Sequence, residues 1–115
     1  MPMTPEDTSD INLRAMLKED FGIDLPISGG TGNSRDRPVI IGYRIPNHYV
    51  AVEHTVLRCL GIGRRVEWKL LQQALIEHNG RKLDQMQIET ERTTDTQIIT
   101  QIENYYFDVT ECLGR

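Results

Sequence analysis

The chain has 115 residues, of which 38% are hydrophobic and 26% are charged, and its formal net charge at pH 7 is −4. This length suits one domain with one core, so we expect a single domain over residues 1–115. The acidic balance, with a pI near 5.3, argues against nucleic-acid binding, and no apolar run approaches the about 20 residues that a membrane span requires.

The N-terminus and the cysteines indicate where the protein resides. The first seven residues end in two acids and contain no apolar stretch of the kind that secretory signals carry. Cys59 and Cys112 are far apart in the chain and form no Cys-x-x-Cys motif. Cysteines in this setting are typical of reduced thiols, so we expect a cytoplasmic protein.

The first predicted helix ends just before Gly22, a residue that fits the left-handed position after a last helical turn. Thr4 is one candidate N-cap, with proline at the next position, and Ser9 or Asp10 offers a later start. The apolar residues that recur at helical spacing are Leu13, Met16, Leu17 and Phe21.

A polar, glycine-rich segment follows over residues 26–37 and leads directly into an apolar run at residues 38–41. We expect residues 28–37 to form an exposed, mobile loop, because a long segment of this composition is typical of a binding loop or a linker. The residues that we assign to ligand or partner binding are Ser28, Gly29, Gly30, Gly32, Ser34, Arg35 and Arg37.

The glycines of this loop do not match known phosphate-binding motifs. Phosphate loops follow a strand and open a helix, whereas this segment follows a helix and precedes a strand. The spacing of Gly29, Gly30 and Gly32 is not Gly-x-Gly-x-x-Gly, and no Gly-Lys-Ser or Gly-Lys-Thr occurs. A looser anion site with the two serines and two arginines at its rim stays open, and the alternative is a structural or partner-binding loop.

The next predicted elements are a strand and a helix. Residues 39–45 read as a strand that Pro46 closes. Asn47 can then cap a second helix, which runs to about Leu60 and ends at Gly61.

Glu53 breaks the pattern of this second helix. It falls at the centre of an apolar stripe formed by Tyr49, Val52, Val56, Leu57, Cys59 and Leu60. A carboxylate buried there without a partner would be costly, so it must serve either a structural pair or acid–base chemistry. The donors that we expect beside it are, first, Arg44, Arg64 or Arg65 and, second, Trp68, Tyr105 or Tyr106.

Residues 66–79 are open to two interpretations. They have good helix propensity, with Gly80 as a C-cap, but they also read as a long strand with a hairpin turn at residues 78–80. In the second interpretation residues 83–92 and 98–110 form two return arms of matched length. We choose the three-stranded meander.

Together these elements predict an α+β fold in the order α-β-α-β-β-β. The expected sheet is antiparallel and consists of one strand plus the three-stranded C-terminal meander. Two helices are expected to pack on one face of this sheet.

Few residues of the sequence fall in a pattern typical of a metal site or a catalytic site. The three histidines form no zinc-ligand motif, so we expect no metal and no cofactor. No Gly-x-Ser-x-Gly motif is present; Cys59 falls on the edge of an apolar helix face, as core cysteines do, and the acids near Cys112 would raise a thiol pKa. The remaining catalytic candidates are Glu53 and His54.

Two functional hypotheses follow, although the sequence names no substrate or partner. The first is a small non-catalytic interaction protein (an adaptor, a chaperone-like subunit or a neutralising partner) that binds another protein. The alternative is a small-ligand domain or enzyme that uses Glu53 in a pocket roofed by loop 28–37 and takes a small anionic ligand. The lack of a recognisable nucleophile or metal motif favours the first hypothesis, in which the protein is not an enzyme.

Overall fold

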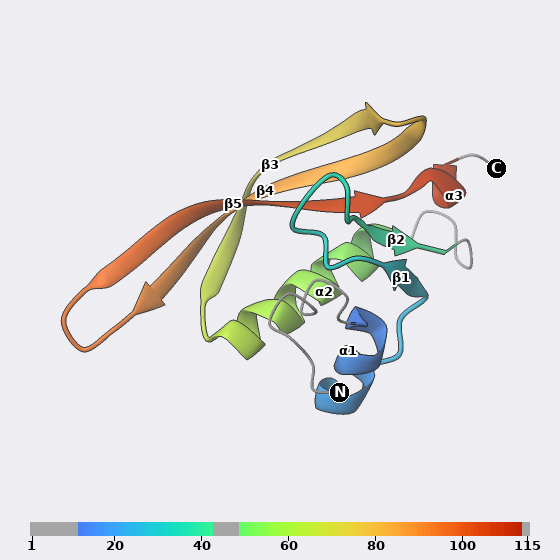
Figure 1. Cartoon of the computed structure of the whole chain (residues 1–115). Helices are drawn as coiled ribbons and strands as arrows, with labels where there is room; N and C mark the ends of the chain where they lie inside the picture. Colours follow the sequence, from blue (N-terminus) through green and yellow to red (C-terminus); the bar gives the residue numbers. More distant parts are fainter. Residues whose placement is uncertain (1–11, 43–48, 114–115) are drawn as a thin grey trace, which may run out of the picture.

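The structure is a computed structural model that describes residues 12–42 and 49–113 (Figure 1). These residues form an α+β fold with one five-stranded mixed sheet. The elements in chain order are α1 (Leu13–Phe21), β1 (Ile27–Gly29), β2 (Val39–Ile41), α2 (Tyr49–Arg64), β3 (Glu67–His78), β4 (Arg81–Thr93), β5 (Ile98–Asp108) and α3 (Thr110–Leu113).

Strand β5 occupies the centre of the sheet, whose order is β1-β2-β5-β4-β3. β3, β4 and β5 pair antiparallel along most of their length, so the predicted C-terminal meander is confirmed. β2, however, pairs with β5 in parallel, with Val39 opposite Phe107. The sheet is therefore mixed, and the predictions of an antiparallel sheet and of the order α-β-α-β-β-β are wrong.

Two local features explain these differences. The first is β1, which pairs antiparallel with β2 and occupies part of the segment expected to be a loop. Because two of its three residues are Ser28 and Gly29, it has no alternating apolar pattern. The second is the crossover from β2 through α2, β3 and β4, which returns the chain so that β5 runs beside β2 in the same direction.

The hairpin at Asn79 and Gly80 makes residues 67–78 a strand rather than a helix. Asn79 has a φ of 54° and Gly80 a φ of 77°, as a two-residue hairpin turn with the twist of the flanking strands requires. A second turn joins β4 to β5, between the two predicted return arms. In it the Thr94 amide donates to the Gln97 carbonyl at 2.8 Å.

Helix α1 is capped at both ends, by a side chain at its N-terminus and by a glycine backbone at its C-terminus. The side chain of Asn12 accepts a hydrogen bond from the Ala15 amide at 3.1 Å. Gly22 takes the left-handed conformation with a φ of 69°, as predicted. The earlier predicted starting points of this helix lie outside the described residues.

Helix α2 continues beyond Gly61, so the predicted end there is wrong. Instead, Arg65 takes the left-handed conformation with a φ of 59°. The Val66 amide donates to the Gly61 carbonyl at 3.0 Å and the Arg65 amide to the Ile62 carbonyl at 3.1 Å, a Schellman motif. Gly61 is buried against Trp68, so packing rather than helix termination requires its small size. Residues 43–48, with the predicted cap of this helix, lie outside the described residues.

The core lies between the helices and one face of the sheet. Figure 1 shows α1 and α2 on the same side of the sheet, and side chains of both belong to one buried cluster. The cluster contains Leu13, Leu17, Ile27, Val39, Ile41, Val56, Leu57, Cys59, Met86, Ile88, Tyr105, Phe107, Val109 and Cys112. Both free cysteines are thus buried.

The sheet extends beyond this core. Residues of β4 from Leu83 to Thr90 are buried or half-buried, but every residue from Glu91 to Ile102 is exposed. We call residues 91–102, which form the end of the β4–β5 hairpin, the arm. In Figure 1 the arm projects away from the helices at the lower left.

Gly61 and Gly63 provide a matched test of the contact between α2 and Trp68. A Cβ at Gly61 would lie 3.0 Å from Trp68 Cδ1 and 3.2 Å from the Val66 carbonyl oxygen, whereas a Cβ at Gly63 meets nothing within 4 Å. We expect Gly63→Ala to raise the free energy of unfolding by about 0.5–1 kcal/mol through helix propensity. Gly61→Ala should lower it, because the clash outweighs the same gain.

Chemical denaturation of both variants measures this difference. Equal stabilisation by the two substitutions would contradict the packing of Gly61 against Trp68.

Candidate functional site

Glu53 of α2 is completely buried, as its position on the apolar stripe predicts. Its side chain is 0% exposed and points to the sheet, where its carboxyl lies beside that of Asp84 on β4. Asp84 is 4% exposed, and Gln73 Nε2 donates to its Oδ2 at 2.6 Å. The interior therefore holds two carboxyl groups side by side, between the helix and the sheet.

This environment keeps the Glu53 proton in place. Burial, together with the neighbouring Asp84 carboxyl, raises the pKa of Glu53 to about 10. At neutral pH Glu53 is therefore protonated, and a neutral carboxyl is much less costly to bury than a carboxylate. Neither of its oxygens has a hydrogen-bond partner of ordinary geometry within the described structure.

The surroundings of Glu53 disfavour negative charge as well. Burial, followed by the charges of Asp84 and Glu53, raises the pKa of Tyr49, one turn earlier on α2. Burial also raises the pKa of the Cys112 thiol, with further contributions from Glu111 and Glu53. A thiol shifted in this direction is a poor nucleophile.

The expected arginine donor has another partner. Arg64 makes two hydrogen bonds of 2.7 Å to the Glu103 carboxylate and one of 3.0 Å to the Tyr105 hydroxyl. The neighbour of Glu53 is thus an acid, and Arg64 and Tyr105 serve a separate ion pair. Arg44 lies outside the described residues.

His54 lies on the flank of α2, where its ring packs against Trp68. The two ring centroids are 5.9 Å apart and the planes are tilted by 49°. His54, the second catalytic candidate, is half-buried, and this contact gives its ring a role in aromatic packing.

The glycine-rich loop lies on the opposite face of the sheet from Glu53. Asp84 is directly opposite Phe107, and both face the helices, so the next residue, Tyr106, faces away. The Arg35 guanidinium lies 5.8 Å from the centroid of the Tyr106 ring, and Asp36 Oδ1 lies 3.1 Å from His78 Nε2. The loop therefore does not roof Glu53.

The glycines of the loop have structural roles. Gly29 and Gly32 have φ values of 82° and 86°, which glycine adopts readily. The Gly30 amide donates to the Pro38 carbonyl at 2.9 Å and the Gly32 amide to the Arg37 carbonyl at 2.8 Å. These two amides are used within the loop, so they do not face an anion in this conformation.

The loop is also attached to the central strand. The Tyr106 amide donates to the Gly32 carbonyl at 2.7 Å, and Gly32 is buried there. Ser28, Gly29, Arg35 and Arg37 are exposed, whereas Gly30 and Ser34 are half-buried. The structure thus brings the predicted loop residues together, and it separates them from Glu53 and His54.

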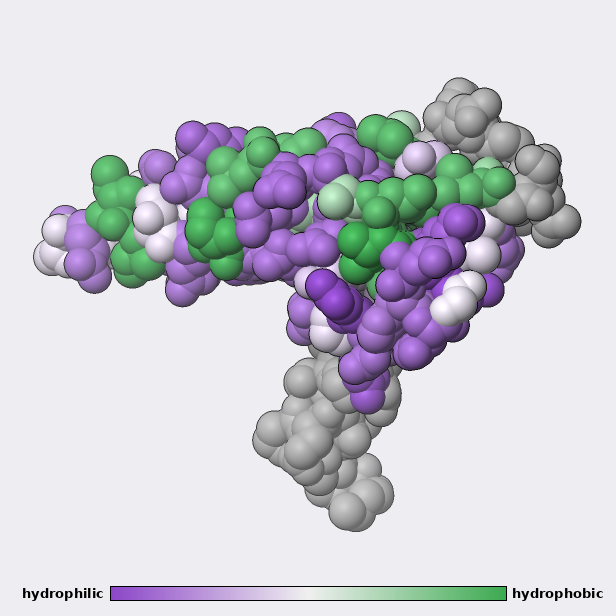
Figure 2. All heavy atoms as spheres, turned by 90° about the horizontal axis from the view of Figure 1, so that it is seen from above, coloured by the Kyte–Doolittle hydropathy of each residue, from purple (hydrophilic) through white to green (hydrophobic). Residues whose placement is uncertain are grey.

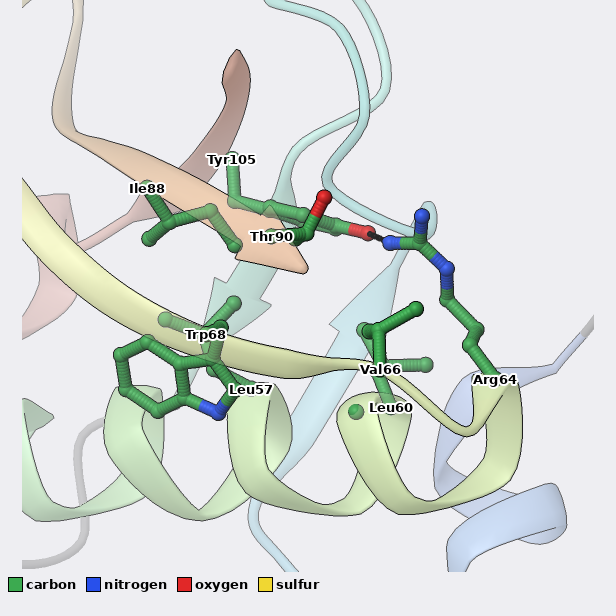
Figure 3. A pocket seen from close by; sticks show the side chains of 9 residues that line it. Leu57, Leu60, Arg64, Val66, Trp68, Ile88, Thr90 and Tyr105 are labelled. Atoms are coloured by element: carbon green, nitrogen blue, oxygen red, sulfur yellow. Dashed lines mark hydrogen bonds between the residues drawn. The ribbon is translucent and has the colours of Figure 1, made fainter. Parts of the chain in front are cut away.

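The pockets around the described residues are small. The pocket in Figure 3 lies between α2 and the sheet and holds about 10 Å³, with Leu57, Trp68 and Tyr105 among its walls. Two other hollows hold about 140 Å³, between β3 and β4, and about 130 Å³, beside Arg64 and Ile99. Sites for small molecules usually enclose about 300–1,000 Å³, whereas the first pocket suits a single water molecule.

Metal sites and membrane-spanning helices are two other features that the described part of the chain lacks. There, no three histidine, cysteine or acidic side chains are grouped so that they could hold a metal ion. Among the helices of residues 12–42 and 49–113, none has the length and apolar character needed to cross a membrane.

The arm carries three exposed isoleucines, and one of them, Ile98, is the most exposed apolar side chain among the described strands. Ile98 is 63% exposed, Ile99 37% and Ile102 55%. Figure 2 shows hydrophobic side chains gathered along the projecting arm at the left, between polar ones. This surface was not predicted from the sequence, although the isoleucines close to the turn between β4 and β5 are a signal of it.

Comparison with known proteins adds no family to this description. No protein-family model, no curated protein and no solved structure matches the chain.

The raised pKa of Glu53 predicts a distinct pH dependence of stability. A carboxyl group with an unfolded pKa near 4.5 and a folded pKa of about 10 contributes stability that is complete below pH 4.5. That contribution is lost as the pH rises through this window, by at most about 1.4 kcal/mol per pH unit for one proton. In Glu53→Gln the side chain is neutral in both the folded and the unfolded state, so this loss is absent and we expect the variant to gain stability over wild type between pH 5 and pH 9.

Thermal denaturation over this pH range measures the effect, and Glu19→Gln is the matched control because Glu19 is an exposed residue of α1. Glu19→Gln should follow the wild-type profile. If Glu53→Gln were less stable than wild type at every pH, Glu53 would instead be an ionised partner of a cation.

Proposed function

We propose that this chain is a non-catalytic interaction protein and that the arm, residues 91–102, is the surface through which it binds another protein. The observation that carries the proposal is the exposure of every residue of the arm, isoleucines included. Exposed apolar surface that continues an ordered sheet is typical of a protein–protein interface.

The energetics of the arm support a bound partner. Full burial of an isoleucine side chain contributes about 1.5–3 kcal/mol, and Ile98 and Ile102 leave more than half of their surface in water. A two-stranded ribbon without further packing is also marginally stable by itself. A partner that covers the arm would supply the missing contacts.

The register of the arm shows what such a partner would meet. Ile98 lies opposite Thr93 and Ile102 opposite Glu89, so both isoleucines are on the face that points away from the helices. Ile99 lies on the other face, where it lines the hollow of about 130 Å³. Both faces of the arm therefore offer apolar contacts, which suits a partner that encloses it.

The backbone of β5 offers a second kind of contact. On its β2 side, the described residues pair with β5 only near its end, at Phe107 and Asp108, with one further bond from Tyr106 to Gly32. The preceding part of that edge can accept an extended segment of a partner by strand addition. This mode uses main-chain hydrogen bonds for affinity and the isoleucines for specificity.

The alternative, an enzyme or small-ligand domain built on Glu53, has less support. Glu53 is 0% exposed, and the loop expected to cover it lies on the other face of the sheet. The pocket between α2 and the sheet holds only about 10 Å³. A substrate would have no route to the carboxyl in this conformation.

Affinity capture with the full chain tests the proposal. We expect wild-type protein immobilised on beads to retain a defined partner from native lysate, identified by mass spectrometry. The double variant Ile98→Ser/Ile102→Ser should lose it, because truncation of buried interface anchors costs about 2 kcal/mol or more. Ile62→Ser is the matched control, because Ile62 is 60% exposed but lies on α2.

Titration calorimetry with the purified partner then gives the affinities. A dissociation constant that rises at least about tenfold for the double variant and stays unchanged for Ile62→Ser supports the arm as the interface. Equal affinities for all three proteins would contradict it.

A further inference from the structure

Strand β3 forms one edge of the sheet, and its free edge is unusually long. β3 has 12 residues, which corresponds to about 40 Å, whereas β1 at the other edge has three. No strand of the described ranges pairs with the outer side of β3. Long edge strands are normally protected by charge, proline or bulges, because their unpaired backbone groups recruit other strands.

The middle of β3 has little of this protection. The charged residues Glu67, Lys69 and Glu77 lie toward its two ends, and the strand contains one bulge but no proline. Leu70 is 36% exposed, Leu71 45% and Leu75 56%. The apolar residues of this edge thus remain in contact with solvent although they belong to the main sheet.

The register with β4 assigns each residue of β3 to a face. The bulge between Leu70 and Gln72 inserts Leu71, so the alternation changes phase at that point. The residues that face the helices are Trp68, Leu70, Gln73, Leu75 and Glu77. The residues that face the opposite side are Glu67, Lys69, Gln72, Ala74, Ile76 and His78.

These faces make β3 complementary to itself. In an antiparallel pair of two β3 strands with a twofold axis at Gln73, the two bulges compensate each other and every residue meets one from the same face. This register uses the full length of the strand. The opposite pairs are Glu67 with His78, Trp68 with Glu77, Lys69 with Ile76, Leu70 with Leu75, Gln72 with Ala74, and Gln73 with itself.

No pair in this register places like charges opposite each other, and Glu67 meets a histidine. Leu70 of each copy meets Leu75 of the other on the side of the helices, where α2 leaves both leucines exposed. The pairing would therefore satisfy the free backbone edge and bury each Leu70 against Leu75 of the other copy.

We propose that β3 is a self-association surface, through which two copies of this chain join their sheets edge to edge about a twofold axis at Gln73. The partner that we commit to is a second copy, because the charge pattern and the bulge position of β3 are complementary to those of an identical antiparallel strand. This surface is separate from the arm, so each proposal can fail without the other.

Light scattering coupled to size-exclusion chromatography of the full chain tests the association. We expect wild type to show twice the chain mass of 13.2 kDa at high concentration and to dissociate on dilution. Leu75→Lys should raise the dissociation constant of the dimer at least about tenfold, because it places a charge against Leu70 of the other copy. Ile98→Lys, at a site of similar exposure on the arm, should leave the mass unchanged.

Two cysteine variants test the register. Gln73→Cys places two thiols opposite each other at the axis, within the reach of a disulfide, whereas Gln72→Cys places each thiol opposite Ala74. We expect an intermolecular cross-link under mild oxidation with the first variant and little with the second, while circular dichroism shows that both fold.

A wild type that is monomeric at every concentration would overturn the proposal. Loss of the dimer in Ile98→Lys but not in Leu75→Lys would assign the interface to the arm. Equal cross-linking of Gln72→Cys and Gln73→Cys would overturn the register.

Discussion

The structure depends on a mismatch of length between one helix and the sheet that it covers. α2 has 16 residues and spans about 24 Å, whereas β4 has 13 residues and spans about 44 Å. The helix therefore covers the sheet from Asp84 to Thr90 and leaves the rest of the hairpin without a second layer. α1 packs at the β1 end of the sheet, and at the other end α2 contacts β3 at Trp68, so the following residues of β3 are left without a helix over them. Both interaction surfaces arise from this geometry.

The interface between α2 and the sheet also buries two neighbouring acids, which is energetically costly. Glu53 occupies a core position of α2, and its neighbour Asp84 is a second acid instead of a base. The fold tolerates the pair because Glu53 keeps its proton and Gln73 donates to Asp84. Gln73 belongs to β3, so the edge strand and the buried acid pair are connected. Pairing of β3 with a second copy would hold Gln73 in place and thereby support the interior.

Local signals made part of this fold predictable. Asn79 and Gly80 specified the hairpin, and helical periodicity placed Glu53 in the core, because both depend on neighbours in sequence. The partner of Glu53 could not be predicted, because it depends on the register of β4 against α2. The parallel pairing of β2 with β5 is likewise set by residues far apart in the chain. Gly61 was misread as a helix end because its small size serves packing against Trp68.

Native-state hydrogen exchange tests the central claim, that the uncovered parts of the sheet are stable only when a partner covers them. In dilute protein we predict slow exchange for the amides of residues 83–90 and fast exchange for residues 91–102, because the arm lacks tertiary contacts. Increasing the protein concentration should slow exchange in residues 67–78 and leave the arm fast. Protection of the arm in dilute protein equal to that of residues 83–90 would contradict the account.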